Sequence, residues 1–463
     1  MRWKLLLGVW CQLGVLGCVG SLAQATPDMA AVRARLDEVA RSYTPHDAFM
    51  GAVLVADGDQ VLLDKGYGMA VVEWGIPNAP EVKFRLGSLT KQFTATLVLL
   101  LQQDGKLKID DPVSKYLPDA PKAWEKITLA ELMGHTSGIQ NFTSFKEFRT
   151  WAASAHTSEE ELAFFRDKPL DFEPGSQFAY SNSNYEVLGV VIEKVSGKKY
   201  REMLRERIFD PLGMKDTGLD EDELVLPKRA EGYVPGHAGS GQDGLVILRA
   251  ESMTVPWAAG ALYSTTGDLL KWERGLFGEK VLSAESLKRM TTPGKGGYAL
   301  GLEVRTEDGT QVVSHGGGIE GFNTRLTYLP EKKIAVVVLS NVNGAAPDRM
   351  GNQLLQVALG KTVVLDNERK AVPIAKEELA KFVGEYAMSP TFSVTFAVEG
   401  DTLTGRGSGE QPMPMIYLGL VQGHPRFYVT GIGAEIEFVP DAGGAYTSII
   451  THVAGHDTEG KKK

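Results

Sequence analysis

The sequence predicts an α/β fold of the α+β kind, in which an antiparallel sheet is flanked by helices and joined by a mostly helical insertion, followed by a small all-β, barrel-like domain. Three observations lead to this prediction. Strand patterns occur near both ends of residues 26–360, helical patterns rich in Pro and Gly punctuation fill the middle, and alternation of apolar and polar residues begins near residue 377. At 463 residues, the chain also exceeds what one hydrophobic core usually supports.

The first elements are a helix, a hairpin and a second helix. Residues 29–43 have helical apolar spacing, and residues 51–64 contain two apolar runs separated by Asp57-Gly58-Asp59, as in a hairpin turn. Apolar residues then recur at helical spacing from Ser88 to Gln103, where Asp104-Gly105 marks a helix end. We expect this second helix to lie buried against the sheet.

The insertion and the returning strands complete the first domain. Residues 110–301 combine helical stretches with many Pro and Gly residues. Strand patterns return at residues 310–314, 321–329 and 333–340, and residues 348–359 form a closing helix. Helices from both ends of the domain are therefore expected to pack on one antiparallel sheet, with the insertion beside it.

Changes in composition set the later boundaries. Residues 361–376 are charged and irregular, which is typical of a linker. Residues 377–456 alternate as expected for a small all-β domain. The highly charged residues 457–463 are predicted to form a frayed tail.

The first 25 residues have the pattern of a secretory signal peptide. A basic start precedes an apolar stretch at residues 5–17 and the small-residue exit at residues 23–25. The apolar stretch is short for a membrane anchor, so we expect cleavage, no membrane span in the mature chain, and a periplasmic or secreted location. Lipid attachment at Cys18 is the minority alternative. Both cysteines, Cys11 and Cys18, lie in the leader, so the mature chain would contain no disulfide.

Composition limits the possible partners. The formal net charge is -9 and no basic cluster interrupts the acidic balance, so we expect no nucleic-acid partner. His452 and His456 have the spacing of a helical metal pair, but they lie in a β-patterned segment, so no metal is predicted. We also predict no cofactor. A small-molecule or peptide substrate is expected, and the sequence leaves the oligomeric state open.

The segment Ser88-Leu89-Thr90-Lys91 is the first candidate for catalysis. Its spacing places the hydroxyl and the ammonium on one face of the helix. A serine needs a base to attack a carbonyl, and a partly desolvated lysine with a lowered pKa can be that base. An ordinary helix cap is the alternative for Ser88. The same pattern at Ser196-Gly197-Lys198-Lys199 lies at a polar helix end, where we expect a solvated surface.

Two later segments add candidate residues. Tyr180-Ser181-Asn182 is the only Tyr-x-Asn in the chain; a tyrosine near cations can act as a base, and an asparagine amide can hold a substrate carbonyl. In His315-Gly316-Gly317-Gly318, glycines permit close backbone approach, so a backbone N–H could face an oxyanion, and His315 could bond to the substrate or the tyrosine. Taken singly, these segments also fit a core tyrosine, a helix cap and a glycine-rich turn.

In this order, Ser-x-x-Lys, Tyr-x-Asn and His-Gly-Gly resemble the three-motif signature of the serine β-lactamase and penicillin-binding-protein superfamily, specifically its class C β-lactamase-like branch. The resemblance covers about residues 29–359 and implies a β-lactamase/transpeptidase-like catalytic domain at residues 26–360. The terminal β domain resembles the lipocalin-like module that follows the catalytic domain in several of these hydrolases. Further matching blocks lie at residues 84–95, 127–139, 211–218, 259–269 and 315–322.

The resemblance implies a role for each motif residue. Ser88 would be acylated, Lys91 and Tyr180 would exchange its proton and protonate the leaving group, and Asn182 would bind the acyl side chain. The backbone N–H groups of Ser88 and Gly318 would form the oxyanion hole. The strand segment His315, Gly316 and Gly317 would bind substrate.

The strand motif departs from the β-lactamase pattern. β-Lactamases typically carry Lys-Thr-Gly where this chain has His315-Gly316-Gly317, and histidine there resembles esterases, D-amino-acid peptidases and carboxypeptidase relatives. The change removes a fixed cation that would bind a substrate carboxylate, so efficient β-lactamase activity is not expected.

Two classes of function follow from these residues. In the first, the protein hydrolyses an amide or ester through an acyl-enzyme on Ser88, as a D-amino-acid peptidase, carboxypeptidase or esterase does. In the second, it is a penicillin-binding or sensor-like protein that acylates without efficient turnover. The complete set of Ser88, Lys91, Tyr180 and Asn182 favours the enzyme, because a nucleophile with its base in place is the part that is hardest to assemble.

Overall fold

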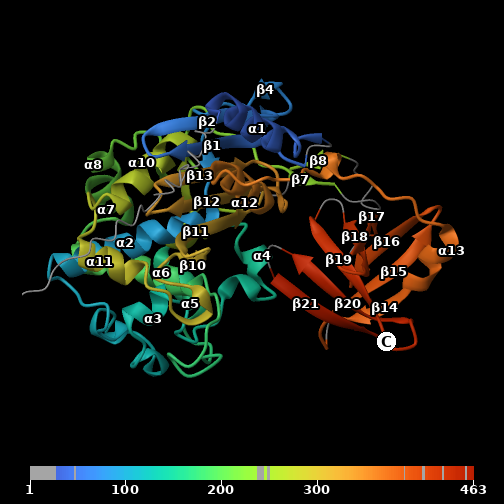
Figure 1. Cartoon of the computed structure of the whole chain (residues 1–463). Helices are drawn as coiled ribbons and strands as arrows, with labels where there is room; N and C mark the ends of the chain where they lie inside the picture. Colours follow the sequence, from blue (N-terminus) through green and yellow to red (C-terminus); the bar gives the residue numbers. More distant parts are fainter. Residues whose placement is uncertain are drawn as a thin grey trace, which may run out of the picture.

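The computed structural model describes residues 28–45, 48–236, 244–247, 251–390, 392–408, 412–429, 432–453 and 456–463. Figure 1 shows a large body, in which helices surround a sheet, and a separate barrel beside it. The predicted leader lies outside the described residues. Among the helices of the described part, none is both long enough and apolar enough to cross a membrane.

A six-stranded antiparallel sheet in the order β10-β11-β12-β13-β1-β2 forms the centre of the body. β1 pairs with β13 from Gly51 opposite Ser340 to Asp57 opposite Ile334, so the N-terminal hairpin lies beside strands that come about 280 residues later in the chain. All seven residues of β13 are buried, as expected for a continuous apolar run covered on both faces. The strands are β1 (Gly51–Asp57), β2 (Gln60–Tyr67), β10 (Glu303–Glu307), β11 (Thr310–Ile319), β12 (Phe322–Leu329) and β13 (Ile334–Ser340).

Helices cover both faces of this sheet. Alternate strand residues point to opposite faces, so Val53 and Val336 pack with α1 (Met29–Arg41) and α12 (Ala346–Ala358) on one side. Leu54 and Val337 belong to the larger cluster on the other side, which contains α2 (Thr90–Gln103) and α10 (Thr266–Phe277). Helices from both ends of the domain therefore share one antiparallel sheet, and the predicted fold class is confirmed.

The insertion beside the sheet is mostly helical. α6 contacts α2, α3, α5 and α9, so the helix that follows the Tyr-x-Asn segment lies against the helix that carries Lys91. The helices are α3 (Leu129–Met133), α4 (Phe148–Trp151), α5 (Ser158–Phe165), α6 (Ser183–Ser196), α7 (Tyr200–Leu204), α8 (Asp210–Leu212), α9 (Trp257–Gly260) and α11 (Ala284–Met290). Short strands around them are β3 (Met69–Val71), β4 (Ile76–Pro77), β5 (Phe84–Arg85), β6 (Gly218–Leu219), β7 (Val234–Pro235), β8 (Leu245–Val246) and β9 (Leu262–Ser264).

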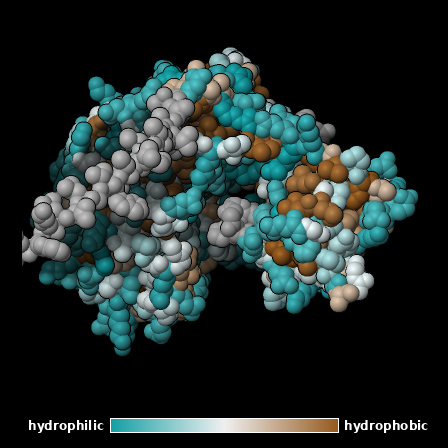
Figure 2. All heavy atoms as spheres, in the orientation of Figure 1, coloured by the Kyte–Doolittle hydropathy of each residue, from teal (hydrophilic) through white to brown (hydrophobic). Residues whose placement is uncertain are grey.

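After a short helix, α13 (Lys376–Leu379), the chain forms a closed antiparallel barrel, as the alternating pattern predicted. The fully buried ring of Phe438 lies at its centre, 4.7 Å from Phe382 and 5.0 Å from Phe396 between centroids. On the face shown in Figure 2, the body is mostly hydrophilic and hydrophobic residues gather on the barrel. The strands are β14 (Gly384–Ala387), β15 (Ser393–Glu399), β16 (Thr402–Gly407), β17 (Met413–Val421), β18 (His424–Val429), β19 (Ala434–Pro440), β20 (Tyr446–Val453) and β21 (His456–Lys462).

The prediction of a frayed tail at residues 457–463 is wrong. These residues belong almost entirely to β21, which pairs with β20 and, through Tyr386 opposite Lys462, with β14. The strand closes the barrel and removes its two free edges. Glu459 and Lys461 are exposed, so the strand rests on backbone pairing and hydrophobic alternation could not reveal it.

Charged and aromatic residues connect the body, the linker and the barrel. Arg349 of α12 pairs with Asp366 of the linker at 3.3 Å and donates to the Tyr428 hydroxyl of β18 at 3.1 Å. Arg369 of the linker lies 3.8 Å above the Tyr428 ring and donates to Glu435 of β19 at 3.1 Å. Tyr428 of the barrel is therefore held by the body through Arg349 and by the linker through Arg369.

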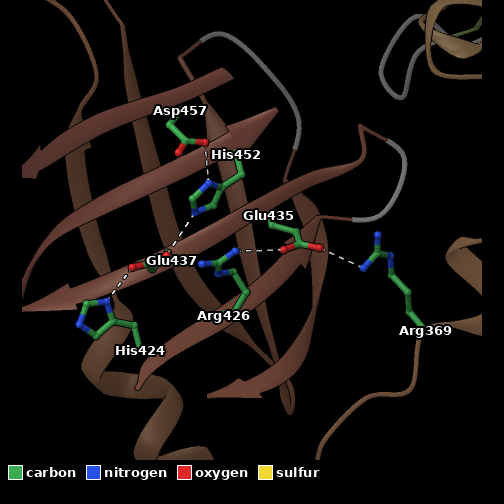
Figure 3. Close-up of polar contacts among 7 residues, drawn as sticks. All are labelled: Arg369, His424, Arg426, Glu435, Glu437, His452 and Asp457. Atoms are coloured by element: carbon green, nitrogen blue, oxygen red, sulfur yellow. Dashed lines mark hydrogen bonds and ion pairs between the residues drawn. The ribbon is translucent and has the colours of Figure 1, made fainter. Parts of the chain in front are cut away.

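The network continues across the outer surface of the barrel strands (Figure 3). Arg426 bonds to Glu435 and Glu437, and Glu437 also bonds to His424 at 2.6 Å. His452, which the sequence analysis considered for a metal pair, instead lies between Glu437 at 3.2 Å and Asp457 at 2.7 Å. Neighbouring strands of the barrel are thus joined by charged side chains as well as by their backbones.

We predict that Phe438→Ala will destabilise the barrel by ~3–5 kcal/mol, because it leaves a cavity among packed aromatic rings. Urea unfolding followed by near-ultraviolet circular dichroism measures this change. Leu420→Ala is the matched control, because its side chain is 66% exposed and its loss should cost no more than about 0.5 kcal/mol. Equal effects of the two substitutions would contradict the packing described here.

Candidate active site

Ser88 lies where a strand passes into the helix that holds the lysine. It belongs to the 3₁₀ turn η2 (Gly87–Leu89), which leads directly into α2. Gly87 has φ of +55°, a conformation that glycine adopts without steric cost. The Thr90 hydroxyl donates to the Gly87 carbonyl at 2.8 Å and so holds the turn. Ser88 lines a cavity of about 500 Å³ together with Asn182 and Gly318.

Lys91 is completely buried one helical turn after Ser88. Its ammonium nitrogen bonds to Ser88 Oγ at 3.0 Å, Asn182 Oδ1 at 2.7 Å and the carbonyl oxygen of Ala259 at 2.9 Å. Three neutral acceptors thus match its three donors. Burial lowers the pKa of Lys91 to about 7, and the nearby Glu186 carboxyl opposes this shift. Near neutral pH the amine can therefore exist as a free base.

Tyr180 packs beside the same two groups. Lys91 Nζ lies 4.9 Å from the centroid of its ring, and the phenol hydroxyl is buried. Burial raises the pKa of Tyr180 above its ordinary value, and interaction with the Ser88 hydroxyl opposes this rise. The contact with Ser88 is looser than an ordinary hydrogen bond, whereas the Lys91–Ser88 bond is fully formed. Catalytic hydrogen bonds often tighten only when substrate is bound.

Asn182 is positioned by a loop as well as by its helix. It is the residue before α6, and its backbone N–H donates to Asn141 Oδ1 at 3.0 Å. Its side-chain oxygen accepts from Lys91, and its NH₂ group donates to the Thr143 hydroxyl at 3.3 Å. Because Asn182 also lines the cavity, its amide bridges the lysine and the space where a substrate would lie.

The glycines of β11 allow the strand to lie directly against the serine turn. A Cβ atom at Gly317 would lie 1.9 Å from the Leu86 carbonyl oxygen, and one at Gly87 would lie 2.8 Å from the backbone nitrogen of Gly318. The N–H of Ser88 belongs to the first helical turn, where no helix carbonyl accepts it. The backbone of Gly318 is thus held beside this N-terminal turn, and both residues line the cavity.

His315 lies deeper than the glycines that follow it. Its ring is 3% exposed, with Nε2 bonded to the Tyr298 hydroxyl at 2.8 Å and Nδ1 to the Gly316 carbonyl oxygen at 2.5 Å. Burial lowers the pKa of His315 to about 4, so the ring is neutral at neutral pH. His315, Gly316 and Gly317 are not among the residues that line the cavity. Their direct contact with substrate stays a prediction.

The structure adds partners that the motifs did not reveal. The Ala259 carbonyl holds Lys91, and Tyr298 holds His315. Ala259 lies in the segment 259–269 that carried part of the resemblance, but no side chain there suggested contact with a lysine. His135, for which no chemical role was expected, is buried against Tyr180 with ring centroids 4.2 Å apart and accepts the Ser181 N–H at 3.2 Å. It therefore supports the tyrosine.

The cavity in front of Ser88 has a chemically mixed lining. It includes phenylalanine rings and the carboxyl groups of Glu251 and Glu320. Burial, together with the neighbouring Glu320 carboxyl, raises the pKa of Glu251 to about 7. Among the described residues, no group of three His, Cys, Asp or Glu residues is placed to hold a metal ion. The remaining lining residues include Phe142, Phe145, Phe148, Lys146 and Arg149.

A buried lysine lies one helical turn from a half-buried serine, and a tyrosine from the loop before α6 and a glycine strand lie beside them. This arrangement defines the active-serine hydrolase class. Residues 37–360 match the family Beta-lactamase. The chain belongs to this family.

Individual relatives agree with this assignment. A D-aminopeptidase of Gluconobacter oxydans is 28% identical over 321 residues, which are 67% of this chain and 59% of the relative. The D-amino acid amidase of Ochrobactrum anthropi, solved with L-phenylalanine amide, is 26% identical with a TM-score of 0.62, covering 72% of this chain and 98% of that one. The octameric penicillin-binding protein homologue of Pyrococcus abyssi covers 94% of this chain and 100% of its own, at 27% identity and a TM-score of 0.66. The protein is a serine hydrolase of this family.

We predict that Gly317→Ala will lower activity by about 100-fold or more, because the added methyl group would push β11 away from the serine turn and displace the oxyanion site. Steady-state kinetics measures the loss, and circular dichroism checks the fold. Gly267→Ala in α10 is the control, because a Cβ there meets nothing within 4 Å and alanine favours a helix. Activity of Gly317→Ala close to wild type would refute the close backbone approach.

Proposed function

We propose that the protein hydrolyses an amide or ester through an acyl-enzyme on Ser88. Neutral Lys91 takes the Ser88 proton as Oγ attacks the substrate carbonyl, and the backbone N–H groups of Ser88 and Gly318 stabilise the oxyanion. The proton then passes through Lys91 and Tyr180 to the leaving group, whose bond to the acyl carbon breaks. A water molecule, deprotonated by the same groups, attacks the ester and releases the acid and the free Ser88 hydroxyl.

One observation carries this proposal: the hydrogen bond from the completely buried Lys91 to Ser88 Oγ at 3.0 Å. A lysine in water would be protonated at neutral pH and could not accept a proton. Burial among neutral acceptors brings its pKa to about 7, which is close to the optimum for a general base at neutral pH.

The cavity supports an aminoacyl amide or ester as the substrate. Its phenylalanine rings suit an apolar side chain, and the carboxyl groups of Glu251 and Glu320, which share the cavity with Lys146 and Arg149, are acceptors for a substrate ammonium group. A D-aminopeptidase and a D-amino acid amidase among the similar proteins favour the D configuration. Neutral His315 provides no fixed cation for a substrate carboxylate, so only weak β-lactamase activity is expected.

We further propose that residues 1–25 direct export and are removed, so that the protein acts in the periplasm or outside the cell. The same proposal divides the mature chain into a catalytic domain at residues 26–360, a linker at residues 361–376 and a lipocalin-like barrel. Cleavage can be checked by mass spectrometry of the protein recovered from the periplasm.

Ser88→Ala is expected to abolish turnover of D-alanine p-nitroanilide and p-nitrophenyl acetate while the melting temperature stays close to wild type, because the substitution removes only the nucleophile. Ser196→Ala is the matched control: it alters the second Ser-x-x-Lys pattern, at the exposed C-terminal end of α6, and should leave turnover unchanged. Stopped-flow kinetics also separates the two function classes. Steady release of product supports the hydrolase, and a single stoichiometric burst supports the sensor.

The pH dependence of kcat/KM is expected to report the ionisation of Lys91. Only the neutral amine can take the Ser88 proton, and its pKa is about 7. The rate constant should therefore rise with pH through about 7 and fall about tenfold per pH unit below it. A profile that stays flat from pH 5 to pH 8 would contradict the role of Lys91 as the base.

A further inference from the structure

Two buried glutamates lie behind the catalytic lysine, and neither has a role in the chemistry described so far. Glu186 is on α6, one turn after Asn182, and Glu161 is on α5, which packs against α6. Each is 1% exposed. Each carboxyl group shifts the pKa of the other, and neither Glu161 oxygen nor Glu186 Oε2 forms an ordinary hydrogen bond among the described residues. Two carboxylates cannot both be charged in such a place, so they must share a proton.

A single residue connects this pair to the active site. Glu186 Oε1 accepts the backbone N–H of Ala259 at 3.2 Å, and the carbonyl of the same residue accepts from Lys91 Nζ at 2.9 Å. Ala259 is therefore hydrogen-bonded to the Glu186 carboxyl through its N–H and to the Lys91 amine through its carbonyl. Ala259 also lines the substrate cavity, so the contact lies within the catalytic machinery.

Glu186 is the acidic group that acts on Lys91. The three direct partners of the amine are neutral, and the carboxyl of Glu186 is the charge that raises the pKa of Lys91. Burial raises the pKa of Glu186, while Glu161, the Ala259 N–H and Lys91 lower it. Other groups facing this region are the Tyr200 hydroxyl beside Glu186, Glu251 near Glu161, and the neutral imidazoles of His135 and His315 near Lys91.

We propose that the Glu161–Glu186 pair is the charge partner of Lys91 and tunes it as the base for the proposed acylation. Before attack, the pair holds one proton, which lies on Glu161, and Lys91 is a free amine. When Lys91 takes the Ser88 proton, the Glu186 carboxylate compensates the new ammonium through the Ala259 peptide. Throughout, Glu161 keeps its proton and donates it in a hydrogen bond to Glu186. The two glutamates are positioning residues, since they act on the substrate only through Lys91.

This proposal rests on the proposed function and makes a separate prediction. Glu186→Gln keeps the size of the side chain but removes the negative charge, so protonated Lys91 loses its compensation and its pKa falls. The acid limb of the pH profile should therefore move to lower pH, by about 0.5–1 unit. Glu161→Leu removes the donor that stabilises the Glu186 carboxylate, so it should shift the limb in the same direction. Glu161→Gln keeps a donor and should restore a profile close to wild type.

The second-order rate constant for release of p-nitrophenol from p-nitrophenyl acetate, measured from pH 5 to pH 9, provides the readout. This constant reports attack by Ser88 whether deacylation is fast or slow, and loss of p-nitrophenol release in Ser88→Ala tests the proposed function separately. Glu273→Gln is the matched control. Glu273 is an equally buried glutamate on α10 whose raised pKa comes from burial alone, so its replacement should leave the acid limb in place.

The outcomes divide clearly. A shift in Glu186→Gln or Glu161→Leu that is absent in Glu161→Gln and Glu273→Gln supports the proposal. Glu186→Gln and Glu161→Leu are each expected to shift the acid limb, so the test stays decisive if one of them does not fold. The melting temperature of each variant shows whether it folds. An acid limb that stays within 0.2 pH unit of wild type in the folded variants, or moves equally in Glu273→Gln, overturns it.

Discussion

The burial of one amine is the constraint on which the rest of the site depends. Removing a lysine from water costs several kcal/mol unless its donors are satisfied, and the cost falls when the amine loses its charge. Lys91 meets the first condition because three neutral acceptors from three separate segments surround it, and it meets the second because burial lowers its pKa to about 7. Those segments are brought together by α2, α6 and α9, which pack on one another. The hydrophobic core that encloses these helices therefore also determines the protonation state of the base.

The sheet supplies the other half of the geometry. Pairing of β1 with β13 joins the two ends of the domain, and this places β11 where its glycines meet the turn that carries Ser88. The helical side thus provides the proposed base, and the sheet provides a backbone surface against the proposed nucleophile. The cavity beside Ser88 is lined by phenylalanine rings and carboxyl groups that come from other segments.

Much of this arrangement could be predicted from the sequence, because apolar periodicity and the three short motifs carry it. The fold class follows from the strand patterns at both ends of the domain, and the three motifs point to Ser88, Lys91 and Tyr180, which the structure places side by side. The closing strand β21 was missed because its side chains are charged and exposed. Glu161 and Glu186 were missed because charged residues in amphipathic helices usually face solvent, and only tertiary packing shows that these two are buried. The depth of His315 likewise depends on Tyr298, a contact that no local pattern encodes.

The contact between the glycine strand and the serine turn also determines where the enzyme can change. A side chain at Gly317 would meet the Leu86 backbone carbonyl, which cannot move aside, so this position of β11 does not tolerate substitution. Phe145 and Phe148 line the cavity and have no such contact with the serine turn. Laboratory evolution of new substrate preferences should therefore vary the loop at residues 142–149 and leave β11 intact. Substrate selectivity can then change while the catalytic groups stay the same.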